Sequence, residues 1–186
     1  MSNTSPTKKE REDYGRDAFA VSSLRTADIE IDRLLECHQG ADRDFVLIEA
    51  ISASILIFYL RPFKGRDPFR LDKSIVPAEF LDLHKGFEDM RDKVIAHRDA
   101  NLPLASWGGP NDFGFIFDGQ TIMPSVYKSL LDPIKAIELK KLIHCLLQIL
   151  APRIGSFYQK HLNAPPPPGH YLISIENTPA SWFTMV

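Results

Sequence analysis

Residues 91–99, which read RDKVIAHRD, place an arginine and a histidine six positions apart inside a helical pattern. Histidine, with an unperturbed pKa of about 6.5, exchanges protons at neutral pH, and arginine supplies a permanent cation that suits phosphate. Together these two side-chain types can support cleavage of an RNA phosphodiester without a metal ion. Arg91 and His97 are therefore the candidate catalytic pair.

The helix expected around this segment has a regular apolar stripe. Its apolar residues recur at the three- and four-residue spacing of a core-facing helix: Phe80, Leu83, Phe87, Met90 and Val94. At roughly 100° per residue, Arg91 lies about 60° to one side of the stripe's centre and His97 about 60° to the other, with Arg98 on the side of Arg91. Both candidate catalytic side chains should therefore flank the buried face. The structural alternative is a salt bridge between Arg91 and Glu88, three residues earlier.

Length and composition limit the possible classes of protein. A chain of 186 residues with 44% apolar residues fits one soluble globular domain with appendages. The net charge of −2 provides no general basic field, so affinity for phosphate must come from a local patch. Cys37 and Cys145 lack the spacing of a metal site, and residues 1–17 lack an apolar signal core. We expect free thiols, no metal, no cofactor and a cytoplasmic location.

The hydropathy pattern predicts an all-α fold, a bundle of four to five helices, within residues 18–162. The polar segment 1–17 is expected to be disordered or frayed. Apolar residues at helical spacing predict four main helices, at about residues 18–37, 42–60, 77–99 and from 132 onward. Pro152 is expected to kink the last of them.

The second of these helices is apolar on nearly every side. Asp42 or Asp44 is its expected N-cap, and Pro62 is expected to end it. The apolar run is shorter than the roughly 18 residues of a membrane span and contains Glu49. The pattern therefore favours a central core helix and no membrane.

Two segments outside the main helices are expected to be extended. Residues 102–126 contain FGFIF and QTIMPSV, separated by the hairpin-turn dipeptide Asp118-Gly119, which predicts a small β-hairpin insertion after the third helix. Residues 163–186 form a Pro-rich C-terminal extension, in which PPPPG is a stiff spacer that precedes a strand in HYLISIE.

The densest basic segment of the chain follows the second helix. Its cations are Arg61, Lys64, Arg66, Arg70 and Lys73, set against two aspartates, Asp67 and Asp72. It could be a solvated loop, or an edge that grips phosphate beside the helix that carries the Arg/His pair. Proximity to that pair decides between the two interpretations.

With four main helices and RDKVIAHRD near the end of the third, the chain resembles the HEPN superfamily, whose hallmark is an arginine, four to six residues, and then a histidine. Five residues intervene here. The polar Asp92 directly after Arg91, and the run AHRD at residues 96–99, match how the motif is often written. The run LRPF at residues 60–63 resembles the stand-alone, abortive-infection-type branch. The resemblance covers residues 19–161 and leaves the hairpin and the tail unmatched.

The resemblance implies an α-helical bundle that commonly dimerises, and in many members a metal-independent endoribonuclease. In this chain His97 would act as general base or acid while the RNA 2′-hydroxyl attacks its own phosphate. Arg91 would stabilise the charge on the pentavalent phosphorus, and the product would be a 2′,3′-cyclic phosphate. Asp92 would orient a ring or a water molecule.

The same resemblance suggests which residues hold RNA and which partners to expect. Lys93 and Arg98 would hold the RNA backbone together with the basic segment, through Arg61, Lys64 and Arg66. For Arg98 a salt bridge at the helix end is the stronger alternative. A toxin or phage-defence effector of this kind would have a neutralising antitoxin protein and would act as a homodimer.

Two other interpretations remain open at this point. In one, the chain is a non-catalytic HEPN-like helical dimer that binds a nucleotide, an antitoxin or another protein. In the other, it is a helical oligomer without a ligand, in which Arg91 pairs with Glu88 or Asp92. The remaining histidines carry no assigned chemistry, and each is expected at the surface or at its boundary: His38, His84, His144, His161 and His170.

Overall fold

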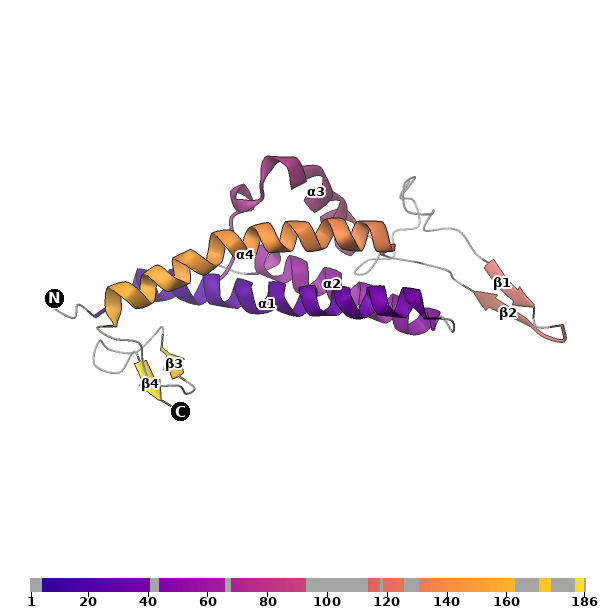
Figure 1. The fold of residues 1–186 in the computed structure, drawn as a ribbon, viewed down its shortest axis with the longest axis horizontal. Coiled ribbons are helices and arrows are strands. Elements are labelled where there is room, and N and C mark those ends of the chain that lie inside the picture. Colours follow the sequence, from indigo (N-terminus) through magenta and orange to yellow (C-terminus); the bar gives the residue numbers. More distant parts are fainter. Residues whose placement is uncertain are drawn as a thin grey trace.

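The structure, a computed structural model, describes residues 5–40, 44–65, 68–92, 114–117, 119–125, 131–162, 171–174 and 183–185. Its α-helices within these ranges are α1 (Lys8–Gln39), α2 (Phe45–Lys64), α3 (Leu81–Met90) and α4 (Pro133–His161). Two short 3₁₀ helices connect α2 to α3, namely η1 (Lys73–Ile75) and η2 (Ala78–Phe80). The four α-helices form an elongated bundle (Figure 1), so the predicted all-α helical bundle is confirmed.

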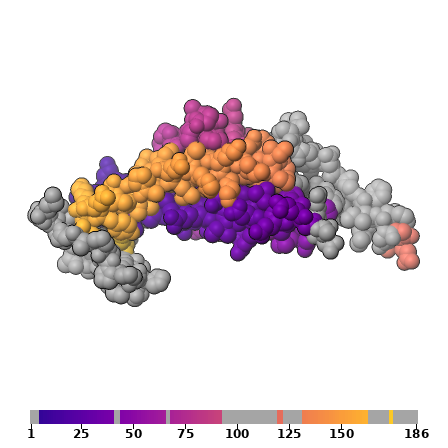
Figure 2. All heavy atoms as spheres, in the orientation of Figure 1, coloured from indigo at the N-terminus to yellow at the C-terminus, as the bar shows by residue number. Residues whose placement is uncertain are grey.

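The core of the bundle lies between α1, α2 and α4. Helices α1 and α4 run side by side, and α2 packs along α1. In the space-filling view α1 and α4 form one continuous face, with α3 rising above it (Figure 2). Each of the three long helices contributes side chains with no exposure, among them Leu24, Ile31, Leu56, Leu139 and Leu142. Removing this apolar surface from water is the main force that holds the bundle together.

The N-terminal part of α1 corrects one prediction, because residues 8–17 are helical rather than frayed. A capping box starts the helix: the Glu10 backbone N–H donates to Thr7 Oγ1 (3.2 Å), and the Thr7 backbone N–H donates to Glu10 Oε2 (2.7 Å). The first turns are also anchored to α4, because the Tyr14 ring packs 4.6 Å from the Phe157 ring. Capping and this aromatic contact stabilise a segment whose polar composition indicated disorder.

Helix α2 begins as predicted and ends later than predicted. Asp44 is its N-cap, with Oδ1 accepting the Leu47 backbone N–H at 3.0 Å. Pro62 does not end the helix, which continues to Lys64. A proline in the last turn removes only one helical hydrogen bond, and the Pro62 carbonyl accepts the Leu71 N–H at 2.8 Å from the returning chain. Lys64 is therefore a helical residue rather than a loop residue.

Helix α2 contributes some of its apolar side chains to the core and exposes others. By length and composition it could cross a membrane, and 44% of its most apolar 18-residue window is buried inside the bundle. Its buried apolar side chains include Ile48, Ile55, Leu56, Tyr59 and Leu60. Several apolar residues of its first turn are exposed instead.

The region predicted as one helix over residues 77–99 is divided. Pro77 precedes the single 3₁₀ turn η2, and Phe80, with φ −108° and ψ 2°, interrupts the α conformation before Leu81. Four of the five residues of the predicted stripe face the core: Phe87 and Met90 are buried, and Phe80 and Leu83 pack against it, while Val94 lies outside the described residues. Arg91 still has helical backbone angles, φ −61° and ψ −49°. Residues 93–99 lie outside the described residues.

Helix α4 starts where the sequence predicted. Asp132 caps it, with Oδ1 accepting the Lys135 backbone N–H at 2.9 Å, and proline occupies the first turn. The helix continues through Pro152 as one element that bends along its length (Figure 1). Ser156 Oγ donates to the Pro152 carbonyl at 2.8 Å.

Short strands lie within the two segments expected to be extended. In the first, β1 (Gly114–Phe117) pairs antiparallel with β2 (Ile122–Ser125), and Gly119 between them has a φ of 98°. In the second, β3 (Tyr171–Ile173) pairs antiparallel with β4 (Phe183–Met185). Most of the predicted insertion at 102–126 and the polyproline spacer lie outside the described residues.

Candidate functional site

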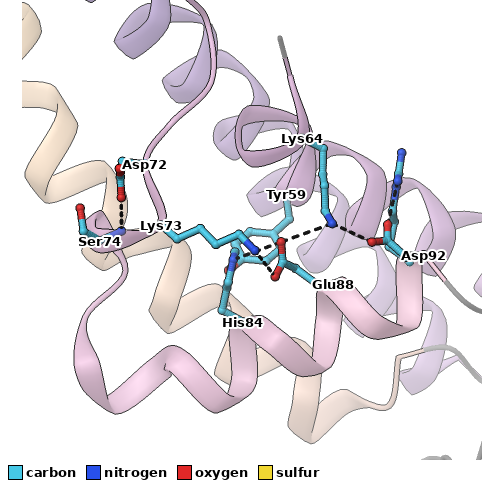
Figure 3. A network of polar contacts seen from close by, with 9 residues as sticks. Tyr59, Lys64, Asp72, Lys73, Ser74, His84, Glu88 and Asp92 are labelled. Carbon is cyan, nitrogen blue, oxygen red and sulfur yellow. Dashed lines mark hydrogen bonds and ion pairs between the residues drawn. The ribbon is translucent and has the colours of Figure 1, made fainter. Parts of the chain in front are cut away.

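The end of α2 and one face of α3 meet in a chain of ion pairs (Figure 3). From α2, Lys64 Nζ lies 2.6 Å from Asp92 Oδ2 and 3.4 Å from Glu88 Oε1. From η1, Lys73 Nζ lies 2.7 Å from Glu88 Oε2. Arg91 Nη1 donates to Asp92 Oδ1 at 2.8 Å. These five residues, called here the α2–α3 network, join three elements around the candidate catalytic arginine.

Local structure explains why these side chains meet. Glu88 and Asp92 are four residues apart, which places both carboxylates on one face of the helical segment. Lys64 occupies the last residue of α2, where a cation is favoured by the partial negative charge of the helix end. Lys73 is held at the start of η1, whose N-cap Asp72 accepts the Ser74 backbone N–H at 2.8 Å.

A buried hydrogen bond lies below the network. Tyr59 Oη and His84 Nδ1 are 2.6 Å apart, and both residues are buried, His84 with only 3% exposure. The His84 ring lies edge-on to Phe63, with centroids 4.7 Å apart, and its Nε2 lies 3.8 Å from Glu88 Oε1. Burial lowers the pKa of His84 below its ordinary value, which favours the neutral ring. The network therefore lies beside a buried cluster of aromatic side chains, in which the neutral form of His84 is favoured.

The cations of the network keep both carboxyl groups ionised. Burial opposes ionisation of Glu88, yet the hydrogen bond from Lys73 and the nearby charge of Lys64 hold its pKa below the ordinary 4.5. Burial likewise opposes ionisation of Asp92, and the hydrogen bond from Lys64 holds its pKa below 3.8. The same bond to Asp92 raises the pKa of Lys64 above 10.5.

The structure brings together three of the predicted site residues: Arg91, Asp92 and Lys64. A fourth, Arg61, is directed elsewhere, because its guanidinium lies 4.8 Å from the centroid of the Phe19 ring on α1. The other predicted site residues lie outside the described residues: Arg66, Lys93, His97 and Arg98. The separation of Arg91 and His97 on either side of the buried face thus stays a prediction.

Several residues in and beside the network were not predicted from the sequence. Glu88 was considered only as a partner of Arg91, but it binds two lysines instead. The expectation that His84 and His161 lie at the surface or at its boundary is wrong, because they are 3% and 2% exposed. One signal was present in the sequence for His84, since it precedes Glu88 by four residues on the same helix face. No sequence signal indicated that Tyr59 would pair with His84.

The arrangement can present positive charge to an anion. Three cations face two carboxylates in the network, and the side chains of Arg91 and Lys73 are 38% and 57% exposed. An exposed guanidinium whose orientation is held by a carboxylate is suited to bind a phosphate group. Among the residues that the structure describes, no group of three or more His, Cys, Asp or Glu side chains could hold a metal ion.

Comparison with known proteins adds no family to these observations. No protein-family model matches the chain, and neither a curated protein nor a solved structure shows significant similarity to it.

Proposed function

We propose that this chain is a HEPN-like, metal-independent endoribonuclease whose catalytic pair is Arg91 and His97. One observation carries the proposal. At the end of the third helix of an α-helical bundle, Arg91 is held by the directly following Asp92 at 2.8 Å while 38% of its side chain stays exposed. An arginine that is oriented and still accessible suits stabilisation of a phosphate on which charge develops.

In the proposed reaction the RNA 2′-hydroxyl attacks the adjacent phosphorus. His97 takes or returns the proton, and the Arg91 guanidinium stabilises the pentavalent phosphorus. The bond from phosphorus to the 5′-oxygen of the next nucleotide breaks, which leaves a 2′,3′-cyclic phosphate and a 5′-hydroxyl. Asp92 accepts a hydrogen bond from Arg91 and sets its orientation. Lys93 and Arg98 are the proposed contacts to the RNA backbone.

A cleavage assay in EDTA tests this proposal. The full-length protein should cut bulk RNA at undiminished rate when EDTA removes divalent cations. Arg91→Met and His97→Ala should each lower the rate by about 100-fold or more, with an unchanged circular dichroism spectrum. Arg25→Met removes an exposed arginine of α1 and should leave the rate unchanged. RNA that stays intact with the wild-type protein under every condition would exclude the proposal.

A second candidate is a non-catalytic HEPN-like module that binds a nucleotide, an antitoxin or another protein. It is favoured by the extent of charge pairing in the α2–α3 network, where each of Lys64, Lys73 and Arg91 already contacts a carboxylate. In that case the wild-type protein would leave RNA intact, and Arg91→Met would weaken the partner's binding.

We also propose that the protein acts in the cytoplasm as a homodimer, with an antitoxin protein as its regulator. The dimer is supported by the exposed apolar start of α2. There Val46 is 78% exposed, and Phe45 and Leu47 are 49% and 45% exposed. Clusters of exposed apolar side chains mark surfaces that associate with other proteins.

A further inference from the structure

We propose that Lys64 is a positioning residue: it holds Asp92, and through Asp92 it fixes the guanidinium of Arg91. This replaces the RNA-backbone role that the basic segment suggested for it. The effect on cleavage rests on the proposed function, whereas the effect on the Arg91 side chain does not.

The two oxygens of the Asp92 carboxylate accept hydrogen bonds from two different residues. Oδ2 accepts from Lys64 Nζ at 2.6 Å, and Oδ1 accepts from Arg91 Nη1 at 2.8 Å. Asp92 therefore bridges a lysine from α2 and the arginine beside it. Without Lys64, the carboxylate would lose its attachment to α2 and would be free to rotate about its χ angles. The Arg91 guanidinium would still contact Asp92. Its orientation would no longer be fixed relative to α2, because among the described contacts the link from Arg91 to α2 runs through Asp92 and Lys64.

The position of Lys64 suits this role better than it suits RNA binding. A lysine that grips a phosphate backbone presents an ammonium group to solvent as a point charge. The Lys64 side chain is only 30% exposed and lies between two carboxylates, Glu88 at 3.4 Å and Asp92 at 2.6 Å. Figure 3 shows it extending from the end of α2 toward both acids.

Lys73 provides a matched comparison within the same network. Lys73 Nζ also binds Glu88, at 2.7 Å, but it contacts Oε2, whereas Lys64 contacts Oε1. The Lys73 side chain is 57% exposed. Among the described contacts it has none to Asp92. Removing Lys73 thus takes away one of the two lysines that pair with Glu88. It leaves intact the link from Lys64 through Asp92 to Arg91.

The direct test is ¹⁵N relaxation of the Arg91 Nε–Hε group in the full-length protein, which needs no RNA. In Lys64→Met and Lys64→Gln the order parameter of this group should fall toward that of a freely moving arginine. Lys64→Arg should restore it, and Lys73→Met should leave it at the wild-type value. An unchanged Arg91 order parameter in both folded Lys64 variants would overturn the proposal.

Kinetics then separate positioning from binding. A misplaced catalytic group lowers kcat, by up to about 100-fold, whereas a lost backbone contact raises KM. We expect Lys64→Met to lower kcat about 10-fold or more with KM within about two-fold, and Lys64→Arg to recover most of kcat. A raised KM at unchanged kcat would instead assign Lys64 to RNA binding. If the wild-type protein cuts no RNA, the proposed function fails, and the relaxation experiment still decides the role of Lys64.

Discussion

The ammonium nitrogen of Lys64 lies 2.6 Å from Oδ2 of Asp92, so the last residue of α2 is bonded to the residue that follows Arg91. Two other polar contacts link α2 to α3: the Tyr59–His84 hydrogen bond at 2.6 Å and the Lys64–Glu88 ion pair at 3.4 Å. In the proposed positioning role, Lys64, which lies 28 positions before Asp92 in the sequence, holds the orientation of Arg91 through Asp92. The contribution of the Lys64–Asp92 ion pair to stability depends on pH.

The first prediction is a loss of stability in acid. The pKa values of Glu88 and Asp92 lie below their ordinary values of 4.5 and 3.8 in the folded protein. The unfolded chain thus binds more protons in this range, so the stabilisation is complete above about pH 4.5 and is lost as pH falls through the lowered pKa values. Urea unfolding between pH 2.5 and 6 measures the slope. Lys64→Met should reduce it and cost at most about 1 kcal/mol at pH 7, while an unchanged slope would mean that Lys64 contributes nothing.

The second prediction concerns the buried pair Tyr59 and His84. Tyr59→Phe leaves His84 Nδ1 buried without the hydroxyl 2.6 Å away, and an unmade buried hydrogen bond costs about 1–3 kcal/mol. Adding His84→Leu removes the unsatisfied ring as well, so the double variant should recover part of that loss. Chemical unfolding of the wild type, both single variants and the double variant completes a thermodynamic cycle. Strictly additive effects would show that the two side chains do not interact.

The third prediction is a cost for removing the cap of α1. Thr7→Ala removes the acceptor for the Glu10 backbone N–H and should lower the free energy of unfolding by about 1 kcal/mol. Thr26→Ala is the matched control, because the described bond of this hydroxyl goes to the Ser22 carbonyl within α1, and alanine favours helix. Hydrogen exchange should show faster exchange in residues 8–17 for the Thr7 variant alone. Equal protection in both variants would contradict the capping-box account.

The fourth prediction tests the proposed homodimer. Val46→Glu places a charge on the exposed start of α2 and should shift the sedimentation coefficient to that of a monomer. Ile29→Glu changes an apolar residue on α1 that is also exposed, by 55%, and should leave the dimer intact. A wild-type protein that sediments as a monomer at all concentrations would exclude the dimer. If both variants dissociate the dimer, the interface is not confined to the start of α2 and includes α1.

Local signals in the sequence predicted the helices well, and contacts between distant residues were not predictable. Asp44, one of the two caps expected for α2, begins that helix, and α4 begins at the predicted position with Asp132 as its cap, because a cap depends on residues within one turn. The continuation of α2 past Pro62 was missed, since it depends on the returning chain at Leu71. The early start of α1 was missed as well, although Thr7 and Glu10 have the spacing of a capping box.

The candidate site was predictable only in part, for the same reason. The Arg91-Asp92 pair is adjacent in sequence, and the sequence named Asp92 as one possible partner of the arginine. The bond from Lys64 and the burial of His84 under Phe63 and Tyr59 depend on how α3 packs against α2, which hydropathy patterns do not specify. A segment with many cations therefore resembled a phosphate-binding loop, whereas two of its lysines bind acids of α3.

The measurement that bears most directly on the central claim is cleavage of matched oligonucleotides in EDTA. One is RNA, and the other has the same sequence with every 2′-hydroxyl replaced by 2′-O-methyl, which cannot attack its own phosphate. The account predicts that the protein cuts only the RNA, that the products end in 2′,3′-cyclic phosphate and 5′-hydroxyl groups, and that Arg91→Met abolishes the cutting. Cleavage of the methylated strand, or RNA left intact by the wild-type protein, would contradict it.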